Sequence, residues 1–459
     1  MQKETRENKM GVMPMGRLIW TMSLPMMLSM LTQALYNIVD SLYLSRIPDI
    51  GEQALSAVSL AFPAQTLMIA FGVGTAVGTA SLLSRSLGAK DYDEVNRAAT
   101  NGLFLAAVTC AVFMALGLCL SHAFFAMQTD DAVIVEGGSR YLMICMVFSF
   151  GIFGQTMMER LLQSTGRTML SMISQLSGAV TNIVLDPLFI FGLGPVPAMG
   201  IAGAAVATVL GQIVAMTLSL LFNIFKNPEI QIRFRGFRPN GGTIRRIYQV
   251  GAPSVVMQAI GSVMSFGMNQ ILLTFSTTAT AIFGVYFKLQ SFAFMPVFGL
   301  NSGLVPVVAY NFGARKPERM ISATKISVMI ATSIMCLGIL AFEAFPRTLL
   351  GFFNPSADML EAGVSALRII GVHFLFAGFC IVAGSVFQAV GNGMYSLWVS
   401  LIRQMIVLLP AAYLLSLTGV LRNVWFSFPI AEVASVIVSS ILLRRTYLTK
   451  VKPLQEGRA

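Results

Sequence analysis

The sequence predicts an all-α polytopic membrane protein, and three observations indicate this class. Of the 459 residues, 56% are hydrophobic and only 11% are charged, and the mean hydropathy is +0.75. A soluble domain carries about 25% charged residues, so a soluble fold is excluded. The apolar runs reach the roughly 20 residues that a spanning helix needs, whereas barrel strands would be short and would alternate in polarity.

Twelve apolar runs divide the chain, and each is expected to form one transmembrane helix. A helix satisfies its own backbone hydrogen bonds, which lipid cannot do. Kinks are expected where proline removes a backbone donor inside a run, at Pro25, Pro63, Pro187 and Pro253. The expected spans are 17–43, 54–82, 97–120, 139–162, 169–193, 200–224, 247–274, 279–308, 321–345, 364–389, 394–417 and 420–443.

Lysine and arginine are distributed unequally between alternate connections. Of 31 such residues, 24 lie in the two tails and the even-numbered connections. The opposite connections hold only Arg46, Arg140, Arg347, Arg368 and Arg422. The positive-inside rule therefore predicts a multi-pass protein of the plasma (cytoplasmic) membrane with both termini in the cytoplasm. The net charge of +11 then concerns topology and membrane lipid, and no nucleic-acid partner is expected.

An internal repeat divides the twelve helices into six and six. Pro25 is matched by Pro253 and Pro187 by Pro410, at offsets of 228 and 223. Other matches stand 225 positions apart: Gln163, Gly166, Met169 and Ser171 with Gln388, Gly391, Met394 and Ser396, and Gly88 and Ala89 with Gly313 and Ala314. Such duplication predicts two bundles of the same helix order.

The predicted domains are an N-terminal lobe (1–225), a basic cytoplasmic linker (226–246) and a C-terminal lobe (247–459) with a short basic tail. Each lobe has an even number of crossings, so both enter the membrane from the same side. A pseudo-two-fold axis along the membrane normal is therefore expected. Two lobes around a central cleft are what transport by alternating access requires.

Two aspartates interrupt apolar helices. Asp40 has Asn37 at i−3, and Asp186 has Asn182 at i−4, so each acid shares a helix face with an amide. At 1.5 Å per residue, both acids are expected about 9 Å inside the outer boundary. A charge at the centre of a span costs about 2.5–3.5 kcal/mol, which favours a functional role. An oxygen cluster of this kind suits Na⁺ or a proton, while the plainer alternative is that each acid only bonds a neighbouring amide or caps a broken turn.

Enzymatic and metal chemistry find no support in the sequence. The five cysteines are widely separated and the two histidines stand alone, so neither a disulfide framework nor a metal motif is expected. No P-loop and no Ser-His-Asp arrangement is apparent. We therefore expect no cofactor, and no metal beyond a Na⁺ ion in the aspartate cluster.

The whole chain, from about Leu18 to Arg445, resembles the multidrug and toxic compound extrusion (MATE) transporters. The resemblance is carried by LPMMLSMLTQALYNIVDSLYLS, SRSLGAKDY, NIVLDPLFIFG and VPVVAYNFGAR. Asp40, Asp186 and Asn182 resemble the pattern of the DinF-like branch, where this cluster is proposed to bind the coupling proton or sodium. The resemblance implies a secondary active multidrug efflux antiporter, conferring drug resistance, that exports small-molecule organic cations and other toxic compounds in exchange for H⁺ or Na⁺. We expect a monomer.

The sequence departs from the NorM branch of that family, which has further acids on helices seven and ten. Here helix seven offers Gln258, Asn269 and Gln270, and helix ten has His373. At an offset of 223, Asp186 aligns with Leu409. The coupling ion is therefore expected in the N-terminal lobe, at Asp40, Asp186, Asn182 and Asn37.

Several other polar residues are expected to line the substrate cavity: Tyr36, Tyr141, Thr208, Gln212, Gln258 and Lys288. For Lys288, which the sequence predicts to be buried, pairing with Glu432 is preferred to substrate binding. The runner-up function is a lipid-linked oligosaccharide flippase of the same superfamily. A flippase would line its cleft with several cations to hold pyrophosphate, and this chain offers only Lys288 and Arg403 in its apolar runs.

Overall fold

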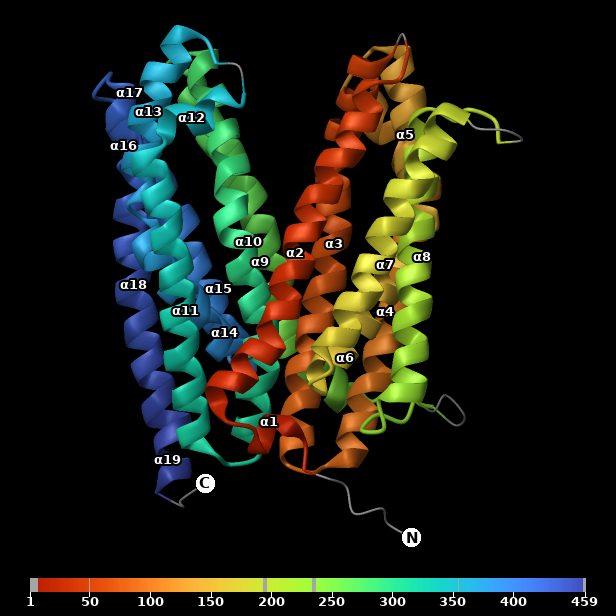
Figure 1. Ribbon diagram of the computed structural model, residues 1–459, viewed down its shortest axis with the longest axis vertical. Coiled ribbons are helices and arrows are strands. Elements are labelled where there is room, and N and C mark those ends of the chain that lie inside the picture. Colours follow the sequence, from red (N-terminus) through yellow and green to blue (C-terminus); the bar gives the residue numbers. More distant parts are fainter. Residues whose placement is uncertain (1–6, 49, 193–195, 233–236, 354, 457–459) are drawn as a thin grey trace. The chain divides into compact units, whose positions relative to one another are not determined.

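A computed structural model of the chain describes residues 7–48, 50–192, 196–232, 237–353 and 355–456 (Figure 1). Every regular element in these ranges is a helix, as the sequence predicted. The start of the predicted N-terminal lobe (1–6), the end of the C-terminal tail (457–459), residues 193–195 after the fifth span and part of the basic linker (233–236) lie outside the described residues.

The helices of the first half follow the predicted spans. They are α1 (Lys9–Val12), α2 (Met15–Ser45), α3 (Gly51–Gly88), α4 (Tyr92–Ala126), α5 (Ala132–Val147), α6 (Phe150–Ser164), α7 (Thr168–Pro187), the π-helical turn η1 (Leu188–Gly192) and α8 (Ile201–Lys226). Pro25, Pro63 and Pro187 all stand inside helices, as expected.

The second half repeats this order. It contains α9 (Gly241–Leu273), α10 (Thr277–Gly313), α11 (Pro317–Ala344), α12 (Pro346–Gly351), α13 (Ala357–Gly371), α14 (Phe374–Ala389), α15 (Gly393–Leu401), the π-helical turn η2 (Ile402–Leu408), α16 (Leu409–Ser416), α17 (Leu421–Val424), α18 (Ser427–Thr446), η3 (Tyr447–Val451) and α19 (Lys452–Gln455). The fourth and tenth expected spans are each broken. The pair α5 and α6 is bent by 44° and the pair α13 and α14 by 47°.

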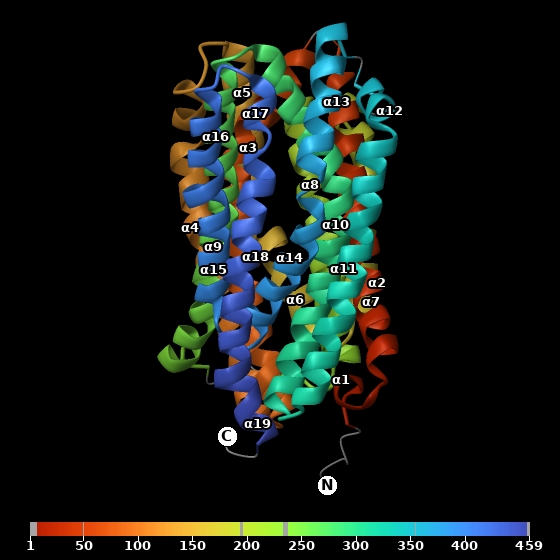
Figure 2. The same cartoon turned by 90° about the vertical axis from the view of Figure 1, so that its left-hand side faces the viewer.

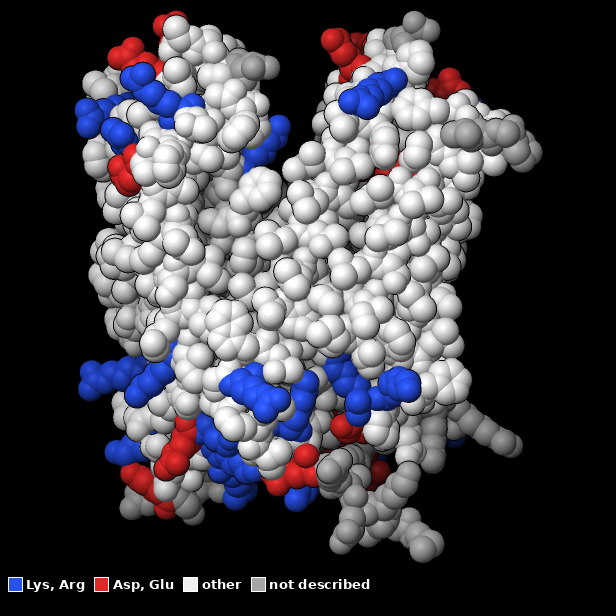
Figure 3. Space-filling model, viewed as in Figure 1, with Lys and Arg blue, Asp and Glu red and all other residues white. Residues whose placement is uncertain are grey.

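The described part of the chain contains ten helices long and apolar enough to cross a membrane, or up to twelve if each bent pair is one span. The twelve predicted spans therefore agree with the structure when each bent pair is counted once. Figure 3 shows that the surface midway along the helices carries few charged residues on the face in view, with lysine and arginine gathered toward the helix ends. This distribution is the one that a lipid-embedded surface requires.

The chain forms two compact units, one of Met1–Met27 with Val256–Ala459 and the other of Leu28–Val255. The division falls inside α2 and inside α9, so each of these helices begins in one unit and continues in the other. The prediction divided the chain at the 226–246 linker, according to the order of the helices along the sequence. The two units are instead defined by which residues pack together. We call them the C-terminal unit and the N-terminal unit below.

Glycine pairs explain how the first parts of α2 and α9, the two helices that are divided between the units, pack within their own unit. In the N-terminal unit, a Cβ atom on Gly78 would collide with the carbonyl of Ile247 in α9, and one on Gly74 with Val255. The G-x-x-x-G spacing of Gly74 and Gly78 is the pattern that permits such close packing between membrane helices.

The C-terminal unit contains the counterpart of that contact, 225 positions later. A Cβ atom on Gly299 of α10 would lie 2.5 Å from the Cα of Met27, and one on Gly303 would lie 2.6 Å from the Oγ of Ser23. The first part of α2 therefore packs on α10 as the first part of α9 packs on α3.

The turns that end the spans also repeat. Lys90 and Arg315 have positive φ angles of 61° and 55°, and Gly166 and Gly391 have φ angles of 88° and 84°. In each case the next amide donates back into the helix, for example Asp91 N to Ser86 O at 2.9 Å and Lys316 N to Asn311 O at 2.9 Å. Identical turn geometry at an offset of 225 confirms the internal repeat.

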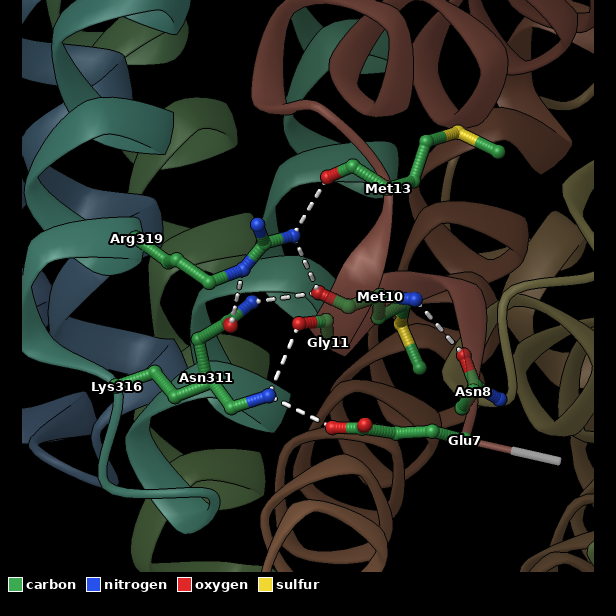
Figure 4. A network of polar contacts seen from close by, with 8 residues as sticks. All are labelled: Glu7, Asn8, Met10, Gly11, Met13, Asn311, Lys316 and Arg319. Atoms are coloured by element: carbon green, nitrogen blue, oxygen red, sulfur yellow. Dashed lines mark hydrogen bonds and ion pairs between the residues drawn. The ribbon is translucent and has the colours of Figure 1, made fainter. Parts of the chain in front are cut away.

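Charged residues at the start of α11 hold the segment before α2 (Figure 4). Arg319 donates to the carbonyls of Met10 and Met13 at 3.1 and 2.8 Å and to Asn311 Oδ1 at 3.0 Å. Lys316 donates to Gly11 O and pairs with Glu7 at 2.7 Å. We call this set of contacts the N-terminal anchor.

In the N-terminal unit, Glu94 of α4 holds the start of α9 in the corresponding way. Its carboxylate pairs with Arg246 at 2.9 Å and accepts a hydrogen bond from Thr243 Oγ1 at 3.1 Å. Glu94 and Arg319 stand 225 positions apart and carry opposite charges. We call this set the α9 anchor.

The two ends of the described chain belong to the C-terminal unit and lie at the same end of it (Figures 1 and 2). There α1 packs against α10 and α19 packs against α11. This arrangement is the one expected of an even number of crossings.

Candidate functional site

The contact between α7 and α8 places the polar residues of the N-terminal unit. Gly178 and Gly211 let these helices meet backbone to backbone, because a Cβ atom on Gly211 would lie 2.6 Å from Gly178 O and 3.2 Å from the Cβ of Asn182. A Cβ atom on Gly178 would in turn lie 2.7 Å from Gly211 O. This close approach brings Asn182 of α7 against Thr208 of α8.

Asp186 lies on the last turn of α7 and is fully buried, with 0% of its surface exposed. The Nδ2 group of Asn182, also buried, lies 3.4 Å from Asp186 Oδ1 and 3.3 Å from Thr208 Oγ1. The i−4 spacing read from the sequence therefore forms the expected contact between amide and acid. Thr208, which was expected to line the substrate cavity, instead contacts the partner of the acid.

The backbone changes its winding directly after Asp186. Pro187 ends α7 and the π-helical turn η1 follows it, as is common near functional sites in membrane helices. The amides of Met199 and Gly200 donate to the carbonyls of Phe189 and Ile190 at 2.9 and 3.1 Å, which ties η1 to the start of α8. The acid thus lies between a regular helix and a fixed irregular turn.

Asp40 of α2 belongs to the same unit and is near enough to Asp186 for the two carboxylates to repel each other. Three buried oxygen atoms in this group have no hydrogen-bond partner among the described residues: Asp40 Oδ1, Asp186 Oδ2 and Asn182 Oδ1. Buried polar atoms are rarely left without a partner, and such exceptions are typical of sites that take up an ion or a proton.

Two tyrosines stand beside these acids. Tyr36 lies within electrostatic range of both Asp40 and Asp186, and Tyr141 lies within range of Asp40. Gln65 of α3 donates to the hydroxyl of Tyr141 at 3.1 Å. Sequence reasoning missed Gln65, although a single amide in the apolar run of the second span is a signal that could have identified it.

The structure does not bring every predicted residue to this group. Asn37 is exposed, and no described contact joins its side chain to Asp40. Gln212 lies toward α6, where a Cβ atom on Gly151 would be 3.2 Å from its own Cβ. Gln258 is exposed and belongs to the C-terminal unit.

The prediction for Lys288 is corrected by the structure. Lys288 is exposed, not buried, and its Nζ lies 5.8 Å from the centroid of the Phe353 ring. Glu432 pairs instead with Arg403, at 3.7 Å, because α18 packs against the turn η2 that carries Arg403. The sequence showed which charges lie in the apolar runs but not which helices meet.

The site in the N-terminal unit consists of oxygen-bearing side chains, those of Asp40, Asp186, Asn182 and Thr208. Carboxylate, amide and hydroxyl oxygens are ligands for hard cations, and a carboxylate also binds a proton. Within the described residues, no group of three or more His, Cys, Asp or Glu side chains has the arrangement of a metal site.

Comparison with known proteins identifies the family. The MatE family model matches residues 25–188 and 253–414, which together make up more than half of the chain. The multidrug export protein MepA of Staphylococcus aureus (strain MSSA476) is 24% identical over 448 residues, covering 97% of both chains. An FAD transporter of Shewanella oneidensis is 25% identical over 432 residues, covering 94% of this chain and 95% of that one.

Solved structures agree with the family match. A MOP superfamily transporter from Pyrococcus furiosus, described as having a binding pocket of reverse polarity, has a TM-score of 0.90 and 25% identity, covering 99% of this chain and all of that one. An outward-facing multidrug resistance MATE family transporter has a TM-score of 0.90 and 26% identity, with the same coverage. These relatives are named as transporters, as was predicted, and not as enzymes. The chain belongs to the MatE family.

Proposed function

We propose that this protein is an ion-coupled multidrug exporter that moves small organic cations across the plasma membrane by alternating access, in exchange for H⁺ or Na⁺. The coupling ion binds at Asp40, Asp186 and Asn182 in the N-terminal unit. Both termini lie in the cytoplasm, and the protein works as a monomer.

The observation that carries this proposal is the set of unpartnered buried oxygens on Asp40, Asp186 and Asn182. Two carboxylates that repel each other in a low dielectric gain most from an ion or proton held between them. The family match and the names of the relatives support a transporter of drugs. Among the described residues, Asp40, Asp186 and Asn182 do not together form the arrangement of a catalytic site.

The test is efflux of ethidium, a fluorescent organic cation, from proteoliposomes under separate H⁺ and Na⁺ gradients. One of the two gradients should drive efflux by the wild-type protein, which identifies the coupling ion. Asp40→Asn and Asp186→Asn should each abolish this gradient-driven efflux while the protein remains inserted and monodisperse.

A matched control in the same unit is Glu136→Gln. Glu136 is exposed on α5 and pairs only with Arg140, at 2.7 Å. This variant should transport at the wild-type rate. Wild-type efflux by both aspartate variants would contradict the proposal, and movement of lipid-linked oligosaccharide without ethidium efflux would favour the flippase.

A further inference from the structure

The C-terminal unit also buries an acid, although the sequence predicted no coupling residue on its helices seven and ten. Glu432 lies on α18 and only 2% of its surface is exposed. It stands in a helix that is long and apolar enough to span the membrane. An acid in such a position is costly, so it needs either a partner or a proton.

The charged partner of Glu432, Arg403, is held only loosely. Arg403 Nη1 lies 3.7 Å from Glu432 Oε2, whereas a charge-assisted hydrogen bond measures about 2.7–2.9 Å. The other oxygen, Glu432 Oε1, is buried and has no hydrogen-bond partner among the described residues. By contrast, Glu94, which is also buried, is held by Arg246 at 2.9 Å and by Thr243 at 3.1 Å.

The groups around Glu432 come from three neighbouring elements. Tyr286 of α10, whose buried hydroxyl also has no partner, lies within electrostatic range of Glu432. So does His373 at the start of α14, whose Nδ1 lies 2.5 Å from Ile370 O. Cys380 of α14 also lies beside Glu432. With Arg403 of η2, these are the titratable groups that the described structure places around this acid.

Aromatic rings pack around the cluster. The ring of His373 packs against Phe294, Phe374 and Phe428, with centroids 6.1, 4.9 and 5.9 Å away. Tyr286 also packs on Phe428, at 5.6 Å. In such surroundings an ionised carboxylate without a cation beside it is strongly disfavoured.

The two members of the ion pair differ in their access to water. The Arg403 side chain is 28% exposed, whereas that of Glu432 is 3% exposed. Arg403 also lies in the π-helical turn η2, a local departure from regular helix that is common at functional sites. Arg403 can therefore turn toward water, but Glu432 cannot follow it.

We propose that Glu432 is a second proton-binding site, at which a proton and the Arg403 guanidinium replace each other. In the proposed paired state, which has the contact seen in this structure, the ionised carboxylate faces Arg403. When Arg403 turns away, a hydronium ion transfers its proton to Glu432, which gives a neutral carboxylic acid and water. The proposal adds a site to the proposed function but does not depend on the aspartate cluster.

The test uses dicyclohexylcarbodiimide, which modifies protonated carboxyl groups in apolar surroundings, with the purified full-length protein and peptide mass spectrometry. Labelling of Glu432 should fall about tenfold per pH unit above its midpoint, as the protonated fraction does. Arg403→Gln should extend the labelling to higher pH, because the competing cation is gone. Glu94, which is buried but firmly paired, should stay unlabelled over the same range.

Two results would overturn the proposal. One is the absence of Glu432 labelling at every pH in both the wild type and Arg403→Gln. The other is equal labelling of the two proteins across the pH range, since Arg403 would then not compete with the proton. The double variant Asp40→Asn/Asp186→Asn should keep the Glu432 labelling. The labelling test can therefore fail while the aspartate site stands, and it can succeed even if the aspartate site is wrong.

Discussion

The two units share one scaffold and differ in where they carry charge. Gly78 and Gly303 fill the same role 225 positions apart, each allowing a crossing helix to pack closely. At an offset of 223 from Asp186, however, stands Leu409, and 225 positions before Glu432 stands Ala207. Each unit thus keeps a buried acid on a helix where the other unit has an apolar residue. The close backbone contacts thus repeat between the units, whereas the positions of the buried acids do not.

The largest expected loss of stability comes from placing a side chain in the glycine contacts, where α9 packs on α3 and α2 packs on α10. Gly78→Val and Gly303→Val should each destabilise the folded protein by about 1–3 kcal/mol or more, because the new side chain meets backbone that cannot yield. Thermal unfolding in detergent measures this directly. Gly284→Ala is the matched control, since no atom lies within 4 Å of its Cβ position. If only one of the two valine variants is unstable, the glycine contacts at Gly78 and Gly303 are not equivalent.

A more local effect is expected when either the N-terminal anchor or the α9 anchor is removed. Arg319→Ala removes hydrogen bonds to Met10, Met13 and Asn311, and Glu94→Ala removes those to Arg246 and Thr243. Each loss should cost about 1–3 kcal/mol locally, because partly buried groups are left without partners.

Hydrogen–deuterium exchange shows which anchor has opened. Arg319→Ala should raise exchange at residues 8–15 and leave the start of α9 unchanged, and Glu94→Ala should do the reverse. Exchange that rises in both segments in either variant would show that the two anchors are coupled and do not act separately.

The smallest effect concerns Thr208. Thr208→Val removes the hydroxyl that lies 3.3 Å from Asn182 Nδ2, which should weaken coupling-ion binding by about 1 kcal/mol, or roughly fivefold. The measurement is the ion concentration that gives half-maximal ethidium efflux. Thr208→Ser keeps the hydroxyl and should behave as the wild type. Equal values for valine and serine would remove Thr208 from the site.

Much of the scaffold could be predicted from the sequence, because hydrophobic run length and turn glycines leave direct marks in it. The turns at Gly166 and Gly391 fall at the predicted offset and share one backbone conformation. The contact between Asn182 and Asp186 was also predictable, since the i−4 spacing on one helix fixes it.

Contacts between helices could not be predicted in the same way. The pairing of Glu432 with Arg403, and not with Lys288, depends on which faces of α18 and η2 meet. The spacing of Gly74 and Gly78 is typical of a close helix contact. It does not show that the partner is the first part of α9. Gln65 joins Tyr141 only because α3 and α5 pack together.

The central claim is that the N-terminal unit binds the coupling ion at Asp40 and Asp186. The most direct measurement is the ion flux that accompanies ethidium export, followed with pH-sensitive and Na⁺-sensitive dyes in the same proteoliposomes. For the wild type, we predict that either H⁺ or Na⁺ moves in the opposite direction to ethidium, in a fixed ratio to the ethidium exported. For Asp40→Asn/Asp186→Asn we predict no such ion movement, even though this variant still binds ethidium. An unchanged counter-flux in the double variant would contradict the account.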